Sequence, residues 1–121
     1  MKRQMELIRK ILGHIEEKGS RQPMSDIEIP GYENDEVEYH LLIMSEANLI
    51  KADFTLMTDG REKLHYVYRL TWEGHEFLDA SKNTNVWRKV KSQINEKGMD
   101  VPFEVFKGIL MVAVKSFLME G

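Results

Sequence analysis

Apolar residues recur at the spacing of a helical stripe near the start of the chain, over about residues 2–18. A stripe that repeats every three to four positions is typical of a helix with one face in a core. Gly19 is expected to end this helix, because glycine readily takes the left-handed conformation after a last turn. The stripe consists of Met5, Ile8, Ile11, Leu12 and Ile15.

A short strand is predicted after a loop over residues 20–25. Ile27 and Ile29 are separated by one acidic residue and followed by Pro30-Gly31, which is a pattern of alternation closed by a turn. We expect this strand to lie along the edge of a hairpin further on, so that the protein has a three-stranded sheet.

An acidic helix followed by a hairpin forms the centre of the pattern. Asn34 is expected to cap the helix, which is helical in pattern through Ala47 and ends at residues 48–50. Apolar residues then tend to alternate over residues 50–57 and 63–70, with Asp59-Gly60 as a hairpin turn between them. The face toward the core is expected to carry Ile50, Ala52, Phe54, Leu56, Leu64, Tyr66, Tyr68 and Leu70, and the outer face Lys51, Asp53, Thr55, His65, Val67 and Arg69.

Three more helices are predicted after the hairpin. Thr71 starts a short one that runs to Leu78, and a polar linker over residues 81–85 leads to a helix over about 85–97 that Gly98 ends. Pro102 fits the first turn of a last helix over about 102–119, which is apolar nearly all round.

This order of parts predicts an α+β fold in a single domain, residues 1–121. Residues 1–80 would form a winged-helix-like core with an N-terminal helix, the acidic helix and a small antiparallel sheet whose β-hairpin is the wing. Residues 81–121 would add two C-terminal helices that pack on this core or form a dimer interface.

Composition excludes several classes of protein. The chain has 121 residues, 42% of them apolar and 31% charged, which is ordinary for a globular protein. The absence of cysteine excludes disulfides and thiolate metal sites. Charged residues interrupt the apolar positions behind Met1-Lys2-Arg3, so no secretory core is expected, and the apolar run at residues 108–114 is too short to span a membrane. We therefore expect a cytoplasmic protein without a membrane partner.

Several motifs are distinctive: Gly31-Tyr32, Tyr39-His40-Leu41, the string from Leu70 to Leu78, and Trp87. Together they resemble the YjcQ-type family of small bacterial and phage proteins. The resemblance covers nearly the whole chain and implies a winged-helix-like α/β domain, often prophage-encoded, without catalytic residues. The chain departs from the family in having Asn48 where glycine is more frequent, and a less charged last helix.

The distribution of charge argues against conventional DNA reading. A winged helix normally places a helix in the major groove, where acidic side chains would be repelled by phosphates. The acids of the helix in the reading position are instead a candidate surface for a basic protein partner: Glu33, Asp35, Glu36 and Glu38. The wing and the basic helix could still hold a DNA backbone, or simply be a solvated face, and their residues are Lys51, Arg61, Lys63, Arg69, Arg88, Lys89 and Lys91.

No metal, cofactor or enzyme is predicted. The four histidines lack tight ligand spacing, and we expect His40 to pair with Glu36 and His75 to cover Trp72. There is no phosphate-binding glycine loop, serine elbow or thiol nucleophile. Tyr66, Tyr68 and Trp72 could stack on bases, but the alternation favours core packing for the tyrosines.

The sequence thus predicts a non-enzymatic winged-helix-like binding module, a phage- or prophage-related regulator or adaptor that binds a protein or a DNA backbone. The alternative is a small structural or assembly protein that forms homo-oligomers through its apolar last helix. The candidate residues for that interface are Phe106, Ile109, Met111, Val114 and Phe117.

Overall fold

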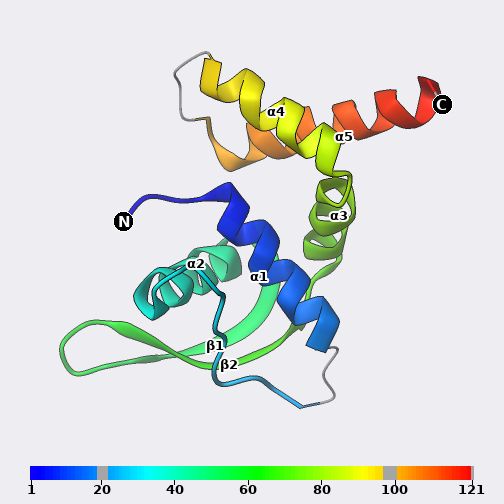
Figure 1. Ribbon diagram of the computed structural model, residues 1–121. Helices are drawn as coiled ribbons and strands as arrows, with labels where there is room; N and C mark the ends of the chain where they lie inside the picture. The colour runs from blue at the N-terminus through cyan, green and yellow to red at the C-terminus, as the bar shows by residue number, and fades with distance from the viewer. Residues whose placement is uncertain (19–21, 97–100, 121) are drawn as a thin grey trace. The chain divides into compact units, whose positions relative to one another are not determined.

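Five helices and a two-stranded antiparallel hairpin make up the computed structural model, which describes residues 1–18, 22–96 and 101–120 (Figure 1). The hairpin lies between the second and third helices in the chain, and the predicted α+β class is confirmed. The chain divides into a first unit, Met1–His75, and a second unit, Glu76–Gly121. None of the described helices is long and apolar enough to cross a membrane. The elements are α1 (Met5–Lys18), α2 (Asn34–Glu46), β1 (Ile50–Leu56), β2 (Glu62–Leu70), α3 (Trp72–Ser81), α4 (Thr84–Glu96) and α5 (Phe103–Glu120).

Helix α1 supplies one wall of the core of the first unit. Its buried face follows the predicted stripe, except that Leu7 is buried and Met5 is only half-buried. The helix packs against α2 and β2, which bury Val37, Leu41 and Val67. The predicted stop at Gly19 lies outside the described residues.

Helix α2 begins one residue earlier than predicted, so the expected cap at Asn34 is wrong. Glu33 occupies the N-cap position with an extended backbone, and its N–H donates to Oε1 of Glu36 (3.2 Å). In a capping box, the side chain of the third helical residue accepts the backbone N–H of the N-cap residue, and the Glu36 carboxylate does this for Glu33. The negative charge also lies at the positive end of the helix dipole.

The C-terminal end of α2 is a Schellman motif centred on Asn48. Asn48 has a φ of 62°, in the left-handed region, and its N–H donates to the carbonyl oxygen of Ser45 (3.0 Å). The N–H of Leu49 donates to the carbonyl oxygen of Met44 (2.9 Å). These two bonds satisfy carbonyl groups that the helix itself leaves without donors. The predicted stop is therefore confirmed.

The hairpin turns over residues 57–61. The N–H of Gly60 donates to the carbonyl oxygen of Met57 (3.0 Å), and the N–H of Met57 donates to that of Arg61 (2.7 Å). Gly60 has a φ of 88°, which a side chain would strain. A short turn closed by a left-handed glycine is a common hairpin connection, so the predicted turn at Asp59-Gly60 is confirmed.

The prediction of which β2 residues face the core is wrong at three positions, Tyr66, Val67 and Tyr68, and Tyr66 lies opposite Asp53 on the outer side. The pairing shifts between Lys51 and Ala52 and again between Asp53 and Phe54, so that β2 holds extra residues at Tyr68 and His65. Each extra residue reverses the alternation beyond it. Val67 is consequently buried and Tyr68 is exposed, the opposite of the expectation. At the open end of the hairpin, Leu56 is also exposed, although it was expected to face the core.

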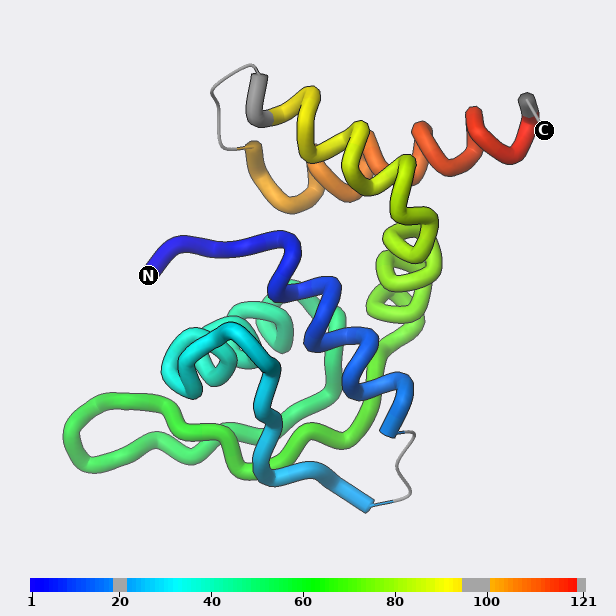
Figure 2. The backbone as a smooth tube through the Cα atoms, in the orientation of Figure 1, coloured from blue at the N-terminus to red at the C-terminus, as the bar shows by residue number. Residues whose placement is uncertain are grey.

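The predicted third strand is not formed by the described residues. Ile27 and Ile29 are buried, but in irregular backbone. A single bridge joins this segment to the hairpin, with the N–H of Met24 donating to the carbonyl oxygen of Val67 (2.9 Å) and the reverse bond at 2.8 Å. Figure 2 shows the segment crossing the hairpin. The sheet is therefore two-stranded.

Helix α3 starts at the residue after Thr71, as predicted, and extends three residues beyond the predicted end at Leu78. The side-chain oxygen of Thr71 accepts the N–H of Gly74 (3.0 Å) and donates to the carbonyl oxygen of Asn48 (2.5 Å). Thr71 thereby caps α3 and ties it to the end of α2. Gly74 packs directly on the backbone of Leu49, where a Cβ would overlap the carbonyl oxygen.

The second unit is built around four aromatic rings. Phe77 lies 6.0 Å from Trp87 and 5.2 Å from Phe103, and Trp87 lies 5.3 Å from Phe106, all measured between ring centroids. Asn83 caps α4 by accepting the N–H of Val86 (3.0 Å). The predicted stop of α4 at Gly98 lies outside the described residues.

Candidate interaction sites

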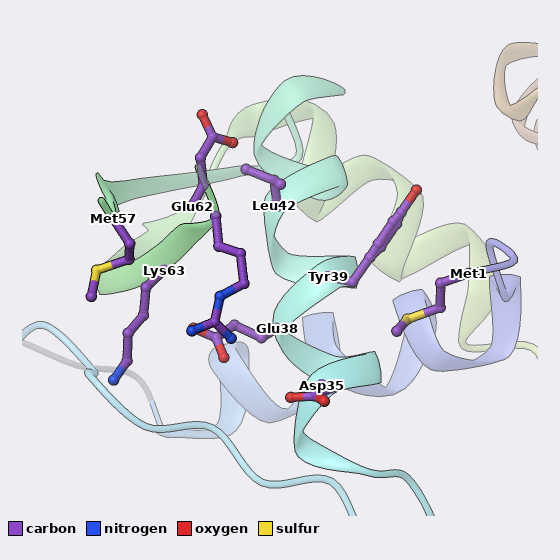
Figure 3. Close-up of a pocket in the computed structure, with 9 residues that line it drawn as sticks. Met1, Asp35, Glu38, Tyr39, Leu42, Met57, Glu62 and Lys63 are labelled. Atoms are coloured by element: carbon purple, nitrogen blue, oxygen red, sulfur yellow. The ribbon is translucent and has the colours of Figure 1, made fainter. Parts of the chain in front are cut away.

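A cleft of about 550 Å³ lies in the first unit between α2 and the turn end of the hairpin. Figure 3 shows α2 supplying Asp35, Glu38, Tyr39 and Leu42, while Met57, Glu62 and Lys63 come from the hairpin. Met1 and Arg61 complete the lining. The cleft is open to solvent and combines an apolar floor with charged walls, which is the composition of a recognition site rather than of a core void.

The charges in the cleft favour a cation. Three carboxylates line it, from Asp35, Glu38 and Glu62, against two basic side chains. Arg61 directs its Nε to Oδ2 of Asp59 (2.7 Å), and its backbone and side-chain hydrogen bonds hold the pKa of Asp59 below the usual range. The charge of Arg61 is therefore already matched within the turn, and Lys63 alone opposes the three acids.

Glu38 has a structural task as well. Its Oε1 accepts the N–H of Leu64 (3.0 Å), which lies on the edge of β2 that does not pair with β1. An unpaired strand edge is a template for unwanted pairing, and a charged side chain bonded to it blocks that edge. Only the second oxygen of Glu38 is left for a ligand.

Glu36 is bonded within the fold to Gln4, the residue that precedes α1. Its Oε2 accepts the side-chain amide of Gln4 (2.8 Å), and this bond, followed by that from the Glu33 N–H, holds the pKa of Glu36 below its ordinary value. Of the four acids predicted as a partner surface, Glu33 and Asp35 are exposed, whereas Glu36 and Glu38 are bonded within the fold.

His40 is fully buried beside this network. Its Nε2 accepts the backbone N–H of Gln4 (2.9 Å), so its Nδ1 carries the proton and donates to the carbonyl oxygen of Glu36 (2.8 Å). The expected pairing of His40 with Glu36 is thus confirmed, and it is made through the backbone carbonyl of Glu36. Both ring nitrogens are used, which leaves none for a metal. Among the described residues no group of three His, Asp or Glu side chains could hold a metal ion.

The seven basic residues predicted to contact nucleic acid are divided between the two units, four in the first and three in the second. Lys51 and Arg69 lie directly opposite each other on the hairpin and are exposed. Arg61 and Lys63 lie at its turn end. The remaining three, Arg88, Lys89 and Lys91, belong to α4 in the second unit.

Two aromatic side chains are more exposed than expected. Tyr68 is 38% exposed and donates its O–H to Oδ2 of Asp53 (2.5 Å). This hydrogen bond raises the pKa of the Tyr68 hydroxyl. Trp72 is 76% exposed, and His75 approaches Glu16 (3.9 Å). The alternation of the sequence could not reveal the position of Tyr68, because the extra residues in β2 have no signature in it.

The predicted oligomer surface on α5 is divided by burial. Phe106 is 3% exposed in the aromatic cluster, so it belongs to the core of the second unit. Ile109 and Phe117 are exposed, while Met111 and Val114 are half-buried. Exposed apolar residues that the prediction omitted are Val105, Val112, Leu118 and Met119.

Comparison with known proteins gives two matches. A family described as "Hypothetical protein (DUF2513)" matches residues 2–100, which include the lining of the cleft except Met1 and exclude α5. An "Uncharacterized protein" of Haemophilus influenzae is 31% identical over 121 residues, covering 98% of this chain and 99% of that protein. No solved structure matches the chain significantly.

Proposed function

We propose a function for a chain that belongs to the family described as "Hypothetical protein (DUF2513)": it is a non-enzymatic, winged-helix-like module that binds a basic segment of a partner protein. The binding site is the cleft between α2 and the hairpin. The protein would act in the cytoplasm as a regulator or adaptor, and the resemblance to YjcQ-type proteins supports a phage or prophage setting.

The winged-helix assignment is supported by the order of elements. Helix α2 leads through its Schellman turn into the hairpin, and the hairpin leads into α3, which Thr71 ties back to the end of α2. In this arrangement the hairpin is the wing and α2 occupies the position of a reading helix.

Helix α2 has the wrong charge for a DNA groove. It contains no lysine or arginine, and the first unit carries 14 acidic against ten basic residues. Binding to a duplex depends on cations that displace condensed counterions. A DNA backbone held by the wing alone, through Lys51, Arg61, Lys63 and Arg69, remains the weaker alternative.

The single observation that carries the proposal is the exposed carboxylate of Asp35 beside an apolar floor. No hydrogen bond or ion pair engages Asp35 among the described residues. A lysine or arginine side chain could lay its aliphatic stem on the apolar part of the cleft lining and place its charge at Asp35. A cleft with both features selects long basic side chains.

The experiment measures binding of a short labelled peptide of alternating lysine and leucine by fluorescence anisotropy. Asp35→Asn should weaken binding about tenfold, the loss typical of one charge-assisted contact. Asp26→Asn removes the same charge at an exposed site outside the cleft and should bind like wild type. Equal losses in the two variants would show that only net charge matters and would refute the site.

A second candidate function, self-association through α5, is favoured by its exposed apolar side chains. Val112 is 68% and Leu118 is 70% exposed, and they belong to a group of exposed apolar side chains on this one helix, which is typical of an interaction surface. Sedimentation velocity of wild type should show a dimer, and Val112→Asp or Leu118→Asp a folded monomer. Phe106→Asp is not a suitable test, because it places a charge in the aromatic cluster. A wild type that stays monomeric at high concentration would refute this candidate.

A further inference from the structure

The face of the hairpin that carries Lys51 differs in character from the cleft. Residues directly opposite each other in an antiparallel pair point to the same side, and so do residues two apart on one strand. Lys51 is opposite Arg69, and Asp53 is opposite Tyr66. Tyr68 also belongs to this side, because its O–H reaches Asp53. These five residues define the outer face.

The outer face carries a row of aromatic rings. The rings of Tyr66 and Tyr68 lie 6.3 Å apart between centroids and are tilted by 52°. The ring of His65 follows at 4.2 Å from Tyr66. This row exists because the two extra residues in β2 turn Tyr68 and His65 out of the regular alternation.

Two cations stand at one end of the row, Lys51 and Arg69, and no ion pair within 4.0 Å engages either of them among the described residues. Lys51 and Arg69 are exposed and directly opposite, an arrangement that costs stability in an antiparallel pair. Arg69 donates Nη1 to the carbonyl oxygen of Leu70 (2.9 Å), which fixes its guanidinium but does not neutralise it. An anion placed between the two would remove the repulsion.

We propose that the outer face binds single-stranded nucleic acid, with bases stacked on Tyr68 and Tyr66 and a backbone phosphate held by Lys51 and Arg69. Aromatic rings that take successive bases beside cations that track the backbone are the features of such sites. The four residue steps from Arg69 to His65 span roughly 13 Å, enough for two or three nucleotides. This inference goes beyond the proposed protein-binding cleft and uses none of its acids.

Asp53 limits the affinity. Its carboxylate orients Tyr68 but lies where phosphates must pass. Binding is therefore weak and modest in its salt dependence. With two cations engaged, the slope of log affinity against log salt is about −1.4, from roughly 0.7 per phosphate on a single strand.

The experiment measures anisotropy of labelled thymidine oligonucleotides, oligouridine of the same length, and an abasic oligonucleotide of the same charge, all at low salt. The thymidine oligonucleotide and oligouridine should both bind, and their relative affinity shows whether DNA or RNA is preferred. The abasic oligonucleotide should bind at least about fivefold more weakly than either of them. Equal binding of the abasic strand would reduce the site to charge attraction and overturn the proposal. So would the absence of binding to either strand with bases.

Three variants of the outer face sharpen the test. Tyr68→Ala should lower affinity at least about fivefold, the lower end of a stacking contribution, whereas Tyr68→Phe keeps the ring and should bind nearly as wild type. Asp53→Asn keeps an acceptor for the Tyr68 O–H, removes a repulsive charge and should raise affinity about threefold.

The matched control is Tyr39→Ala, which removes a tyrosine from the cleft on α2. It should leave nucleic acid binding unchanged, and circular dichroism should show that both alanine variants are folded. A loss in Tyr39→Ala as large as in Tyr68→Ala would overturn the assignment of the stacking site to the hairpin.

Discussion

The contact of Gly74 with Leu49 gives the sharpest test of the packing in the first unit, through the substitution Gly74→Ala. Gly74 lies inside α3, where alanine is preferred over glycine by about 1 kcal/mol, so helix propensity alone predicts stabilisation. The structure predicts the opposite. A Cβ on Gly74 would overlap the carbonyl oxygen of Leu49 and lie 3.1 Å from its carbonyl carbon. Neither atom can yield independently, because both are backbone.

The magnitude follows from what must move. The Leu49 carbonyl oxygen accepts the N–H of Thr71 (3.0 Å), the residue that caps α3. Overpacking typically costs about 1–3 kcal/mol, and a buried group that loses its hydrogen bond adds about 1–3 kcal/mol. After subtraction of the propensity gain, Gly74→Ala should destabilise the protein by about 3 kcal/mol. For a domain of this size that lowers the melting temperature by more than about 10 °C.

Gly13→Ala is the matched control for this prediction. Gly13 also lies within a helix, α1, and a Cβ there meets nothing within 4 Å. This variant should gain about 0.5–1 kcal/mol. Urea denaturation followed by far-ultraviolet circular dichroism gives both values. If Gly74→Ala is as stable as Gly13→Ala, the close approach of α3 to the α2 turn is wrong.

Three further predictions concern the ends of α2 and its contact with α1. Asn48→Gly should raise stability by up to about 1 kcal/mol, since glycine tolerates a φ of 62°, while Asn48→Val should lower it by about 1–2 kcal/mol in thermal melts. His40→Leu should cost about 2–4 kcal/mol in denaturant, because two buried backbone groups, the Gln4 N–H and the Glu36 carbonyl, lose their partner. Glu36 has a lowered pKa in the folded state, mainly through its bond from Gln4, so its contribution is present above about pH 4.5 and lost as the pH falls through its folded value. Stability measured from pH 6 downward should therefore fall less steeply in Glu36→Gln than in wild type, and equal slopes would contradict this assignment.

The order of the five helices and two hairpin strands in the described residues, and several of their ends, were predictable from the sequence because they depend on local signals. The stripe of α1, the stop at residues 48–50, the glycine turn of the hairpin and the start of α3 after Thr71 each depend on a few neighbouring residues. The substitution of Asn48 for glycine still fits, since asparagine also tolerates the left-handed conformation.

The faces of β2 were not predictable, and the reason is physical. Strand register depends on partners that are distant in sequence, and one extra residue moves every side chain beyond it to the other face. The side chain of Val67 is buried and its backbone pairs with that of Met24, while the side chain of Tyr68 turns outward and bonds Asp53. Neither partner is near β2 in sequence. The same is true of Glu38, whose bond to Leu64 joins residues 26 apart.

The interaction surfaces were only partly predictable. Charge along the chain located the acids of α2, but it did not separate the exposed Asp35 from the internally bonded Glu36. That distinction requires the position of Gln4, the residue that precedes α1. Likewise, the apolar character of α5 was evident, but burial of Phe106 by Trp87 depends on the packing of two helices.

The closed edge of β2 has a consequence for how this protein would fail under stress. Met24 and the Glu38 carboxylate occupy hydrogen-bonding groups that would otherwise recruit a neighbouring molecule. If heat or mutation detaches α2, the Glu38 carboxylate leaves with it, and the N–H of Leu64 on the edge of β2 becomes free. That edge can then pair with a strand of another copy. Damaged molecules should consequently precipitate as β-rich aggregates instead of persisting as dispersed, unfolded chains.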